Sequence, residues 1–182
     1  MPSKKKNSAP IKLVLLHGYA GNSGNVWFPW LHRLAEGVGW RVWAPQLPNP
    51  LKPDYGAWMG AVRSEAKSWN GDTVIVGHSM GGVLALRILA ETGVRVGAVI
   101  TVSTPFGSPV PVRQLIRFFS DPIDWVALRR QAGAFVTVHS RNDPLIPFDA
   151  ALRYGETLKS RLILTEKDGH FIGRQAKAVW GE

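Results

Sequence analysis

Six short runs of apolar and β-branched residues recur along the chain, and longer stretches with helical spacing separate them. The runs are Ile11–Leu16, Arg41–Ala44, Thr73–Val76, Val96–Val102, Phe135–His139 and Arg161–Leu164. Parallel strands need helical crossovers, and strands buried on both faces are almost continuously apolar. The pattern therefore predicts an α/β fold, with a mostly parallel sheet of about six strands and helices on both of its faces.

The length of 182 residues fits one domain with a sizeable core. No repeat or shift in composition marks a second domain, so we expect residues 11–182 to form one unit. Residues 1–10 contain three consecutive lysines and are expected to form a flexible basic tail. The N-terminus has no apolar signal segment and no run approaches the ~20 residues of a membrane span, so a cytoplasmic location without a membrane span is expected.

The formal net charge is +9, but the basic residues outside the tail are scattered. Nucleic-acid binding normally needs a clustered basic stripe or a recognisable module, so no nucleic-acid partner is expected. The chain has no cysteine, which excludes disulfides, thiolate nucleophiles and cysteine-ligated metals. No cluster of histidines and carboxylates has metal-ligand spacing. We therefore expect neither a metal nor a cofactor.

The pentapeptide Gly77-His78-Ser79-Met80-Gly81 has the pattern G-x-S-x-G. It follows the predicted strand Thr73–Val76 and precedes Val83–Leu89, which has helical spacing. A nucleophile elbow requires this context, because the turn is so tight that small residues must flank the serine. Ser79 is therefore the candidate nucleophile.

A serine hydroxyl needs a base to take its proton and an acid to orient that base. In parallel sheets the reactive groups lie beyond the carboxyl ends of the strands, and an elbow-type site presents them in the order Ser, Asp or Glu, His. His170 follows the last predicted strand and is the candidate base. The other histidines are weaker candidates; they are His17, His32, His78 and His139, of which His139 is the strongest rival.

Asp143 is the candidate acid, because it follows the penultimate strand and precedes Pro144, which favours an extended turn. Asp168 would have to fold back within its own loop to reach His170. Asp149 begins a predicted helix and suits the N-terminus of that helix.

Acyl transfer also needs hydrogen-bond donors for the oxyanion, commonly the amide after the nucleophile and one from the loop after an early strand. Here the candidates are the backbone N–H groups of Met80 and Tyr19. The glycines of Gly18–Gly24 lack the lysine and spacing of a phosphate-binding loop, so nucleotide binding is not expected.

The segment 104–133 departs from the simple alternation, because it is long and carries four prolines. Two interpretations are open: a small lid that contacts the substrate, or an ordinary helix packed on the sheet through Val112, Leu115, Ile116 and Phe119. Trp27 and Phe106 are the candidate substrate-binding residues, although core packing explains most of the eight tryptophans.

The chain resembles the α/β-hydrolase superfamily, and within it the compact serine hydrolases typified by retinoblastoma-binding protein nine and its bacterial relatives. Besides the pentapeptide, the matching segments are Trp27–Leu31, Gly39–Val42, Pro45–Pro50, Asn142–Pro144 and Gly169–Phe171. The resemblance implies that Ser79, Asp143 and His170 are nucleophile, acid and base of an esterase-like or amidase-like hydrolase without a cofactor. The cysteine-containing motif by which the human member binds pocket proteins is not carried over, because this chain has no cysteine.

The expected function is hydrolysis of a carboxylic ester, thioester or amide of a small acyl compound through an acyl-enzyme on Ser79. The alternative is a noncatalytic binding protein that uses the hydrolase fold, with 104–133 as its interaction surface. One fold and one triad serve many acyl compounds, so the substrate, the choice between hydrolysis and acyl transfer, and the oligomeric state stay open.

Overall fold

The computed structural model describes residues 10–107 and 113–181. Its strands are β1 (Lys12–Leu16), β2 (Arg41–Trp43), β3 (Thr73–His78), β4 (Val96–Val102), β5 (Ala132–Ser140) and β6 (Arg161–Thr165). Its helices are α1 (Phe28–Gly37), α2 (Tyr55–Ala66), α3 (Met80–Thr92), α4 (Arg113–Ser120), α5 (Trp125–Leu128), α6 (Asp149–Leu158) and α7 (Lys177–Trp180). The predicted flexible tail lies, except for Pro10, outside the described residues.

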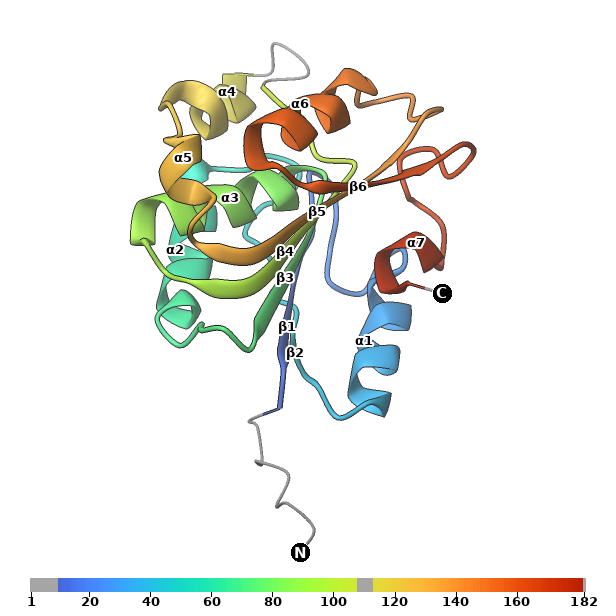
Figure 1. Cartoon of the computed structure of the whole chain (residues 1–182), viewed down its shortest axis with the longest axis horizontal. Helices are drawn as coiled ribbons and strands as arrows, with labels where there is room; N and C mark the ends of the chain where they lie inside the picture. Colours follow the sequence, from blue (N-terminus) through green and yellow to red (C-terminus); the bar gives the residue numbers. More distant parts are fainter. Residues whose placement is uncertain (1–9, 108–112, 182) are drawn as a thin grey trace, which may run out of the picture.

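The strands form one sheet in the order β2-β1-β3-β4-β5-β6, and every pairing between them is parallel (Figure 1). The prediction of a parallel α/β sheet is confirmed. Because β1 pairs with β2 on one side and β3 on the other, the chain changes its direction of winding there. Loops that leave neighbouring strands at such a point diverge, which opens a crevice at the carboxyl edge of the sheet.

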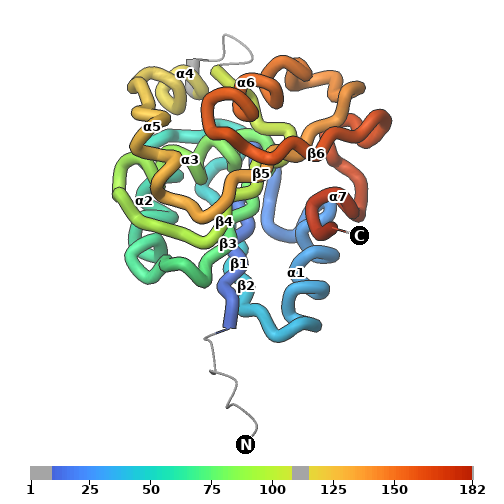
Figure 2. Tube along the Cα trace, viewed as in Figure 1, coloured from blue at the N-terminus to red at the C-terminus, as the bar shows by residue number. Residues whose placement is uncertain are grey.

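The pleat of the strands sends alternate side chains to opposite faces of the sheet. In β1, Val14 and Leu16 pack in the core cluster that includes α2, α3 and α6. Leu13 and Leu15 pack in the cluster on the other face, with α1 and α7. Figures 1 and 2 show these two helical layers on either side of the sheet. Burial on both faces explains why the strands are almost continuously apolar.

The strand β5 begins three residues before the predicted run Phe135–His139. Ala132 and Ala134 pair with Val96 and Ala98 of β4, although small residues alone favour strands weakly. The prediction placed the start of β5 too late, because ladder pairing with β4 outweighs the local preference.

The segment between β4 and β5 contains α4 and α5, and its residues 108–112 lie outside the described part. The helix α4 packs against α2 and α3, and α5 packs against α3 and α6. These two helices therefore form an outer layer over other helices. In α4 the buried side chains are Leu115 and Phe118, whereas Ile116 is exposed. The predicted face of this helix was thus wrong at Ile116, and Val112 lies outside the described residues.

Across residues 10–107 and 113–181, no helix combines the length and apolar character needed to cross a membrane.

The first turn of α3 lies very close to the carboxyl end of β1. A Cβ atom added at Gly81 would lie 2.0 Å from the carbonyl oxygen of Leu16. One added at Gly77 would lie 2.4 Å from the Cα atom of Gly82. Only glycine at these positions lets the helix begin directly against the edge of the sheet.

We expect Gly81→Ala to lower the free energy of unfolding by about 3 kcal/mol or more, because the added methyl group meets backbone that cannot move aside. The matched control is Gly60→Ala in α2, where an added Cβ meets nothing within 4 Å. That variant should be more stable by about 0.5–1 kcal/mol, the helical preference of alanine over glycine. Urea unfolding of both variants tests this, and equal stabilities would contradict the close packing of α3 on β1.

Candidate active site

Ser79 occupies the turn between β3 and α3, with φ 53° and ψ −122°. A positive φ is uncommon for a residue with a side chain and costs about 1–3 kcal/mol unless its surroundings enforce it. The Ser79 N–H donates to the Val102 carbonyl at 2.8 Å, which ties the turn to the neighbouring strand. The side chain is only half-buried. This strand, strained serine and helix have the geometry that a nucleophile elbow requires.

The loop after β1 contacts this turn at the point where the sheet changes its winding direction. A Cβ atom at Gly18 would lie 2.8 Å from the Cβ of Ser79 and 3.2 Å from the amide nitrogen of Met80. The amides of Tyr19 and Met80 donate no hydrogen bond to any other residue that the structure describes. The residues that directly follow Gly18 and Ser79 therefore each carry an unused backbone donor, at the point where the two loops meet.

His170 and Asp143 form a buried pair beyond the ends of β6 and β5. The Nδ1 atom of His170 lies 2.9 Å from Oδ2 of Asp143 and 3.2 Å from its Oδ1. The carboxylate side chain has no exposed surface and the imidazole is 9% exposed. Within residues 10–107 and 113–181, Ser79 and His170 make no direct hydrogen bond. Such contacts are often loose in a site without substrate.

The carboxylate of Asp143 is held in its ionised form. Burial alone would raise its pKa, but the hydrogen bonds from His170 and from the amides of Leu145 and Ile146 outweigh this effect. The nearby Ser103 hydroxyl favours the ionised form as well, although it is buried without a hydrogen bond of standard geometry. The resulting pKa is about 2, so Asp143 is an anion at neutral pH.

Polar side chains connect the loop that carries Asp143 with the loop that carries His170. The Ser140 hydroxyl donates to Oδ1 of Asn142 at 2.7 Å and accepts from the amide of Asp168 at 3.0 Å. The same Asn142 oxygen accepts from the amide of Gly169 at 2.8 Å. Together these bonds set the distance between the two loops.

His78 and Trp27 each donate a hydrogen bond to the backbone of the His170 loop. The Nε2 atom of His78 donates to the His170 carbonyl at 2.8 Å. The indole N–H of Trp27 donates to the Phe171 carbonyl at 2.9 Å. His78 directly precedes Ser79 in the chain. Its hydrogen bond therefore links the backbone of the candidate base to the residue next to the candidate nucleophile.

The remaining histidines have other partners. Nε2 of His17 accepts from the amide of Leu47 at 2.9 Å, which leaves Nδ1 to donate to the Gly18 carbonyl. His139 lies within 3.2 Å of the Ile146 carbonyl and is fully buried. His32 lies 3.2 Å from Glu36 on the surface of α1.

The structure thus brings Asp143 and His170 into contact and places Gly18, the residue before Tyr19, against Ser79 and Met80. Trp27, predicted to line the substrate mouth, has no exposed surface and supports His170 instead. The other predicted substrate contact, Phe106, is partly exposed and lines a pocket beside α3. No group of three or more histidine and carboxylate side chains in the described part could hold a metal ion.

Sequence reasoning missed the supporting residues Ser103, Ser140 and Asn142. Asn142 and Ser140 did carry a usable signal, because both precede Asp143 in a loop at the carboxyl edge of the sheet. Ser103 carried the same signal one strand earlier, directly after β4.

Comparisons with known proteins point to one family. The model of the serine hydrolase family matches residues 13–181. YdeN of Bacillus subtilis (strain 168), named as a hydrolase, is 28% identical over 166 residues, covering 88% of this chain and 86% of YdeN. The serine hydrolase RBBP9 of Rattus norvegicus is 26% identical over 168 residues, covering 90% of this chain and 89% of the relative.

Solved structures extend the comparison to the fold. The crystal structure of the ydeN gene product from B. subtilis superposes with a TM-score of 0.87 at 25% identity, over 93% of this chain and 95% of that chain. Est1E from Butyrivibrio proteoclasticus is 15% identical and has a TM-score of 0.71, over 99% of this chain and 86% of Est1E. The second likeness concerns the fold alone, which this chain also shares with the alpha/beta hydrolase domain-containing protein 10 from mouse.

The pH dependence of stability tests the buried state of His78. Burial, followed by the charge of His170, lowers the pKa of His78 from 6.5 to about 4. Below pH 6.5 His78 therefore binds a proton in the unfolded chain but stays neutral in the folded chain. The free energy of unfolding consequently falls as the pH is lowered to about 4. We expect His78→Gln, which stays neutral, to lose about 2 kcal/mol less than the wild type between pH 7 and 4.5.

Urea unfolding at the two pH values provides the measurement. The control is His32→Gln, because the His32 side chain is 39% exposed. It should keep the pH dependence of the wild type. If His78→Gln also keeps it, His78 is not the neutral buried donor described above.

Proposed function

The chain belongs to the serine hydrolase family, and from this premise we propose that Ser79, Asp143 and His170 cleave a carboxylic ester, thioester or amide through an acyl-enzyme. One observation carries the proposal: the buried Asp143–His170 pair is tied by a hydrogen bond to His78, the residue directly before the strained and partly exposed Ser79. An acid, a base and a nucleophile are the three groups that acyl transfer by serine requires.

In the first half-reaction, Oγ of Ser79 attacks the carbonyl carbon as Nε2 of His170 removes the hydroxyl proton. The negative charge that develops on the carbonyl oxygen accepts hydrogen bonds from the amides of Tyr19 and Met80. When the tetrahedral intermediate collapses, His170 returns the proton to the leaving alcohol, thiol or amine. In the second half-reaction a water molecule gives its proton to His170 and attacks the acyl-enzyme. His170 then returns the proton to Ser79 as the acid is released.

Asp143 has two roles in this mechanism. Its carboxylate keeps the proton of neutral His170 on Nδ1, so that Nε2 is free to accept a proton from Ser79. It also stabilises the imidazolium that forms in each half-reaction. The low pKa of Asp143 keeps the carboxylate anionic throughout.

His78 and Trp27 are positioning residues in this proposal. Their hydrogen bonds to the carbonyls of His170 and Phe171 hold the base on a loop that has no regular secondary structure. Because misplacing a catalytic group by about 1 Å costs about 10²-fold in rate, fixed anchors for this loop are needed.

The first test is labelling with a fluorophosphonate, which reacts with activated serines. We expect the folded protein to be labelled at Ser79, as located by peptide mass spectrometry. Ser79→Ala and heat-denatured protein are the controls and should remain unlabelled. If correctly folded wild type is not labelled, a noncatalytic binding protein on the hydrolase fold becomes the better explanation.

The second test separates Asp143 from its neighbour Asp168. Asp143→Asn should lower kcat/KM for p-nitrophenyl acetate by about 10³–10⁴-fold, because the asparagine favours the wrong tautomer of His170. Asp168→Asn is the matched control, since this exposed carboxylate lies two residues before His170. It should change kcat/KM by less than about twofold. A large loss in Asp168→Asn with activity retained in Asp143→Asn would reverse the assignment of the acid.

A further inference from the structure

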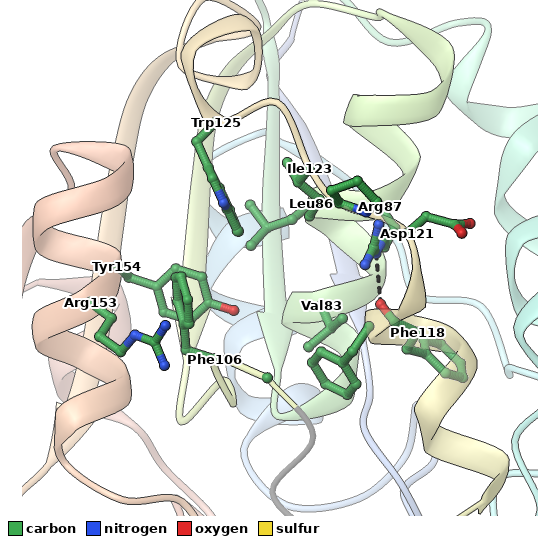
Figure 3. A pocket seen from close by; sticks show the side chains of 13 residues that line it. Val83, Leu86, Arg87, Phe106, Phe118, Asp121, Ile123, Trp125, Arg153 and Tyr154 are labelled. Carbon is green, nitrogen blue, oxygen red and sulfur yellow. Dashed lines mark hydrogen bonds between the residues drawn. The ribbon is translucent and has the colours of Figure 1, made fainter.

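A pocket of about 260 Å³ lies between α3, the α4–α5 region and α6. Figure 3 shows Arg87 and Phe118 on one side of it, and Phe106, Tyr154 and Arg153 on the other. The volume equals that of roughly nine water molecules at about 30 Å³ each, which suits a ligand of about nine non-hydrogen atoms. The outer helical layer therefore encloses space for a small molecule.

The guanidinium of Arg87 is the unexpected group in this pocket. Arg87 is 6% exposed and stands in α3 among apolar residues that are fully buried. Its Nε atom donates to the Phe118 carbonyl at 2.7 Å. Its two terminal nitrogens make no hydrogen bond or ion pair with any residue that the structure describes. A buried cation with unused donors is costly unless an anion or water meets it.

The nearby carboxylates are engaged by other cations. Glu91, one turn further along α3, pairs with Arg63 at 2.7 Å. Asp121, on the rim of the pocket, pairs with Arg117 at 3.4 Å. Neither forms an ion pair with Arg87, so the positive charge of Arg87 is available to a ligand.

The rest of the pocket suits a flat or aliphatic apolar group. Phe106 and Trp125 stack with their centroids 5.3 Å apart, and the ring of Tyr154 meets Phe106 edge to face at 4.9 Å. Arg153 lies 4.1 Å above the Phe106 ring and adds a second cation to the lining. Both Arg87 and Arg153 act to lower the pKa of Tyr154, although burial raises it overall. The pocket thus combines aromatic walls with a positive field.

We propose that this pocket binds a small carboxylate with an apolar body, and that the carboxylate pairs with the terminal nitrogens of Arg87. The guanidinium fork matches the two oxygens of a carboxylate, which makes a bidentate pair the favoured contact. The apolar body lies against Phe106 and Trp125. Two sources share this chemistry: a free acid, or the far end of a substrate.

The position of Arg87 is compatible with either source. Arg87 lies on α3, eight residues after Ser79, which directly precedes the helix. At about 1.5 Å per residue, Arg87 therefore lies about 12 Å further along the helix axis. Val83, also in the pocket lining, lies about 6 Å along the same axis. Whether one molecule reaches both Ser79 and Arg87 rests on the proposed function, whereas binding of a carboxylate at Arg87 does not.

The test is isothermal titration of the full chain with benzoate and with benzamide, which has the same shape and no charge. Ser79→Ala protein is used in parallel, so that binding is measured whether or not Ser79 is a nucleophile. We expect benzoate to bind with a Kd of about 1 mM or below, at least tenfold more tightly than benzamide. The comparison of the two ligands needs no change in Arg87.

Substitutions then locate the site. Arg87→Met should weaken benzoate binding at least tenfold and leave benzamide binding within about twofold. Arg153→Met should weaken benzoate about threefold, as an exposed cation does. The matched control is Arg130→Met, an exposed arginine just after α5 that is not in the pocket lining, and it should bind like the wild type.

Two results would overturn the proposal: equal affinities for benzoate and benzamide in the wild type, or unchanged benzoate affinity in folded Arg87→Met. If Arg87→Met does not fold, Arg153→Met and the two-ligand comparison decide instead. Equal benzoate affinity in Arg153→Met and Arg130→Met would then exclude the pocket.

Fluorophosphonate labelling of Ser79 in saturating benzoate distinguishes the two sources. Slower labelling supports a ligand that extends toward Ser79, and esters that carry a terminal carboxylate should then show a higher kcat/KM than their neutral counterparts. An unchanged labelling rate, with benzoate still bound, supports a separate site for a free acid.

Discussion

The close approach of α3 to the carboxyl end of β1 is the constraint on which the remaining geometry depends. Gly81 meets the Leu16 carbonyl, and Gly18 meets Ser79, at distances that leave no room for a Cβ atom. This packing places Ser79 at the carboxyl edge of the sheet where the winding direction changes, against Gly18 of the loop after β1. A bulkier turn would displace the helix, and with it His78, the residue that holds the carbonyl of His170.

His170, the candidate base, lies in a loop without regular secondary structure. Long-range hydrogen bonds hold this loop in place. His78 joins the His170 loop to β3, and Trp27 joins it to the start of α1. Ser140 and Asn142 join it to the loop of Asp143. Each of these groups is polar and has a partner, so the site gains precision without orphaned donors at these positions. The same low-dielectric surroundings keep His78 neutral and make its protonation costly.

The outer layer formed by α4 and α5 packs on helices and not directly on the sheet. It packs on α2, α3 and α6 and leaves a pocket over the middle of α3. The residues of α3 on either side of position 87 are apolar and buried, so an apolar side chain is expected there, yet the buried residue is an arginine. A charge at such a position lowers stability, and departures from the rules of packing are expected where a protein binds something. This physical conflict underlies the proposed carboxylate site.

The sequence by itself determined the parallel α/β sheet, because strands buried on both faces must be apolar throughout. It also determined the tight turn at Ser79, since only small residues fit around it, and it placed Asp143 and His170 at the same edge of the sheet through chain order. The tertiary structure alone decided that Trp27 is a buried anchor and that β5 begins at Ala132. It alone revealed that Arg87 is buried and forms no ion pair with any residue in the described ranges 10–107 and 113–181. These features depend on contacts between residues far apart in the chain, whose energies outweigh local preference and leave no periodic trace in the sequence.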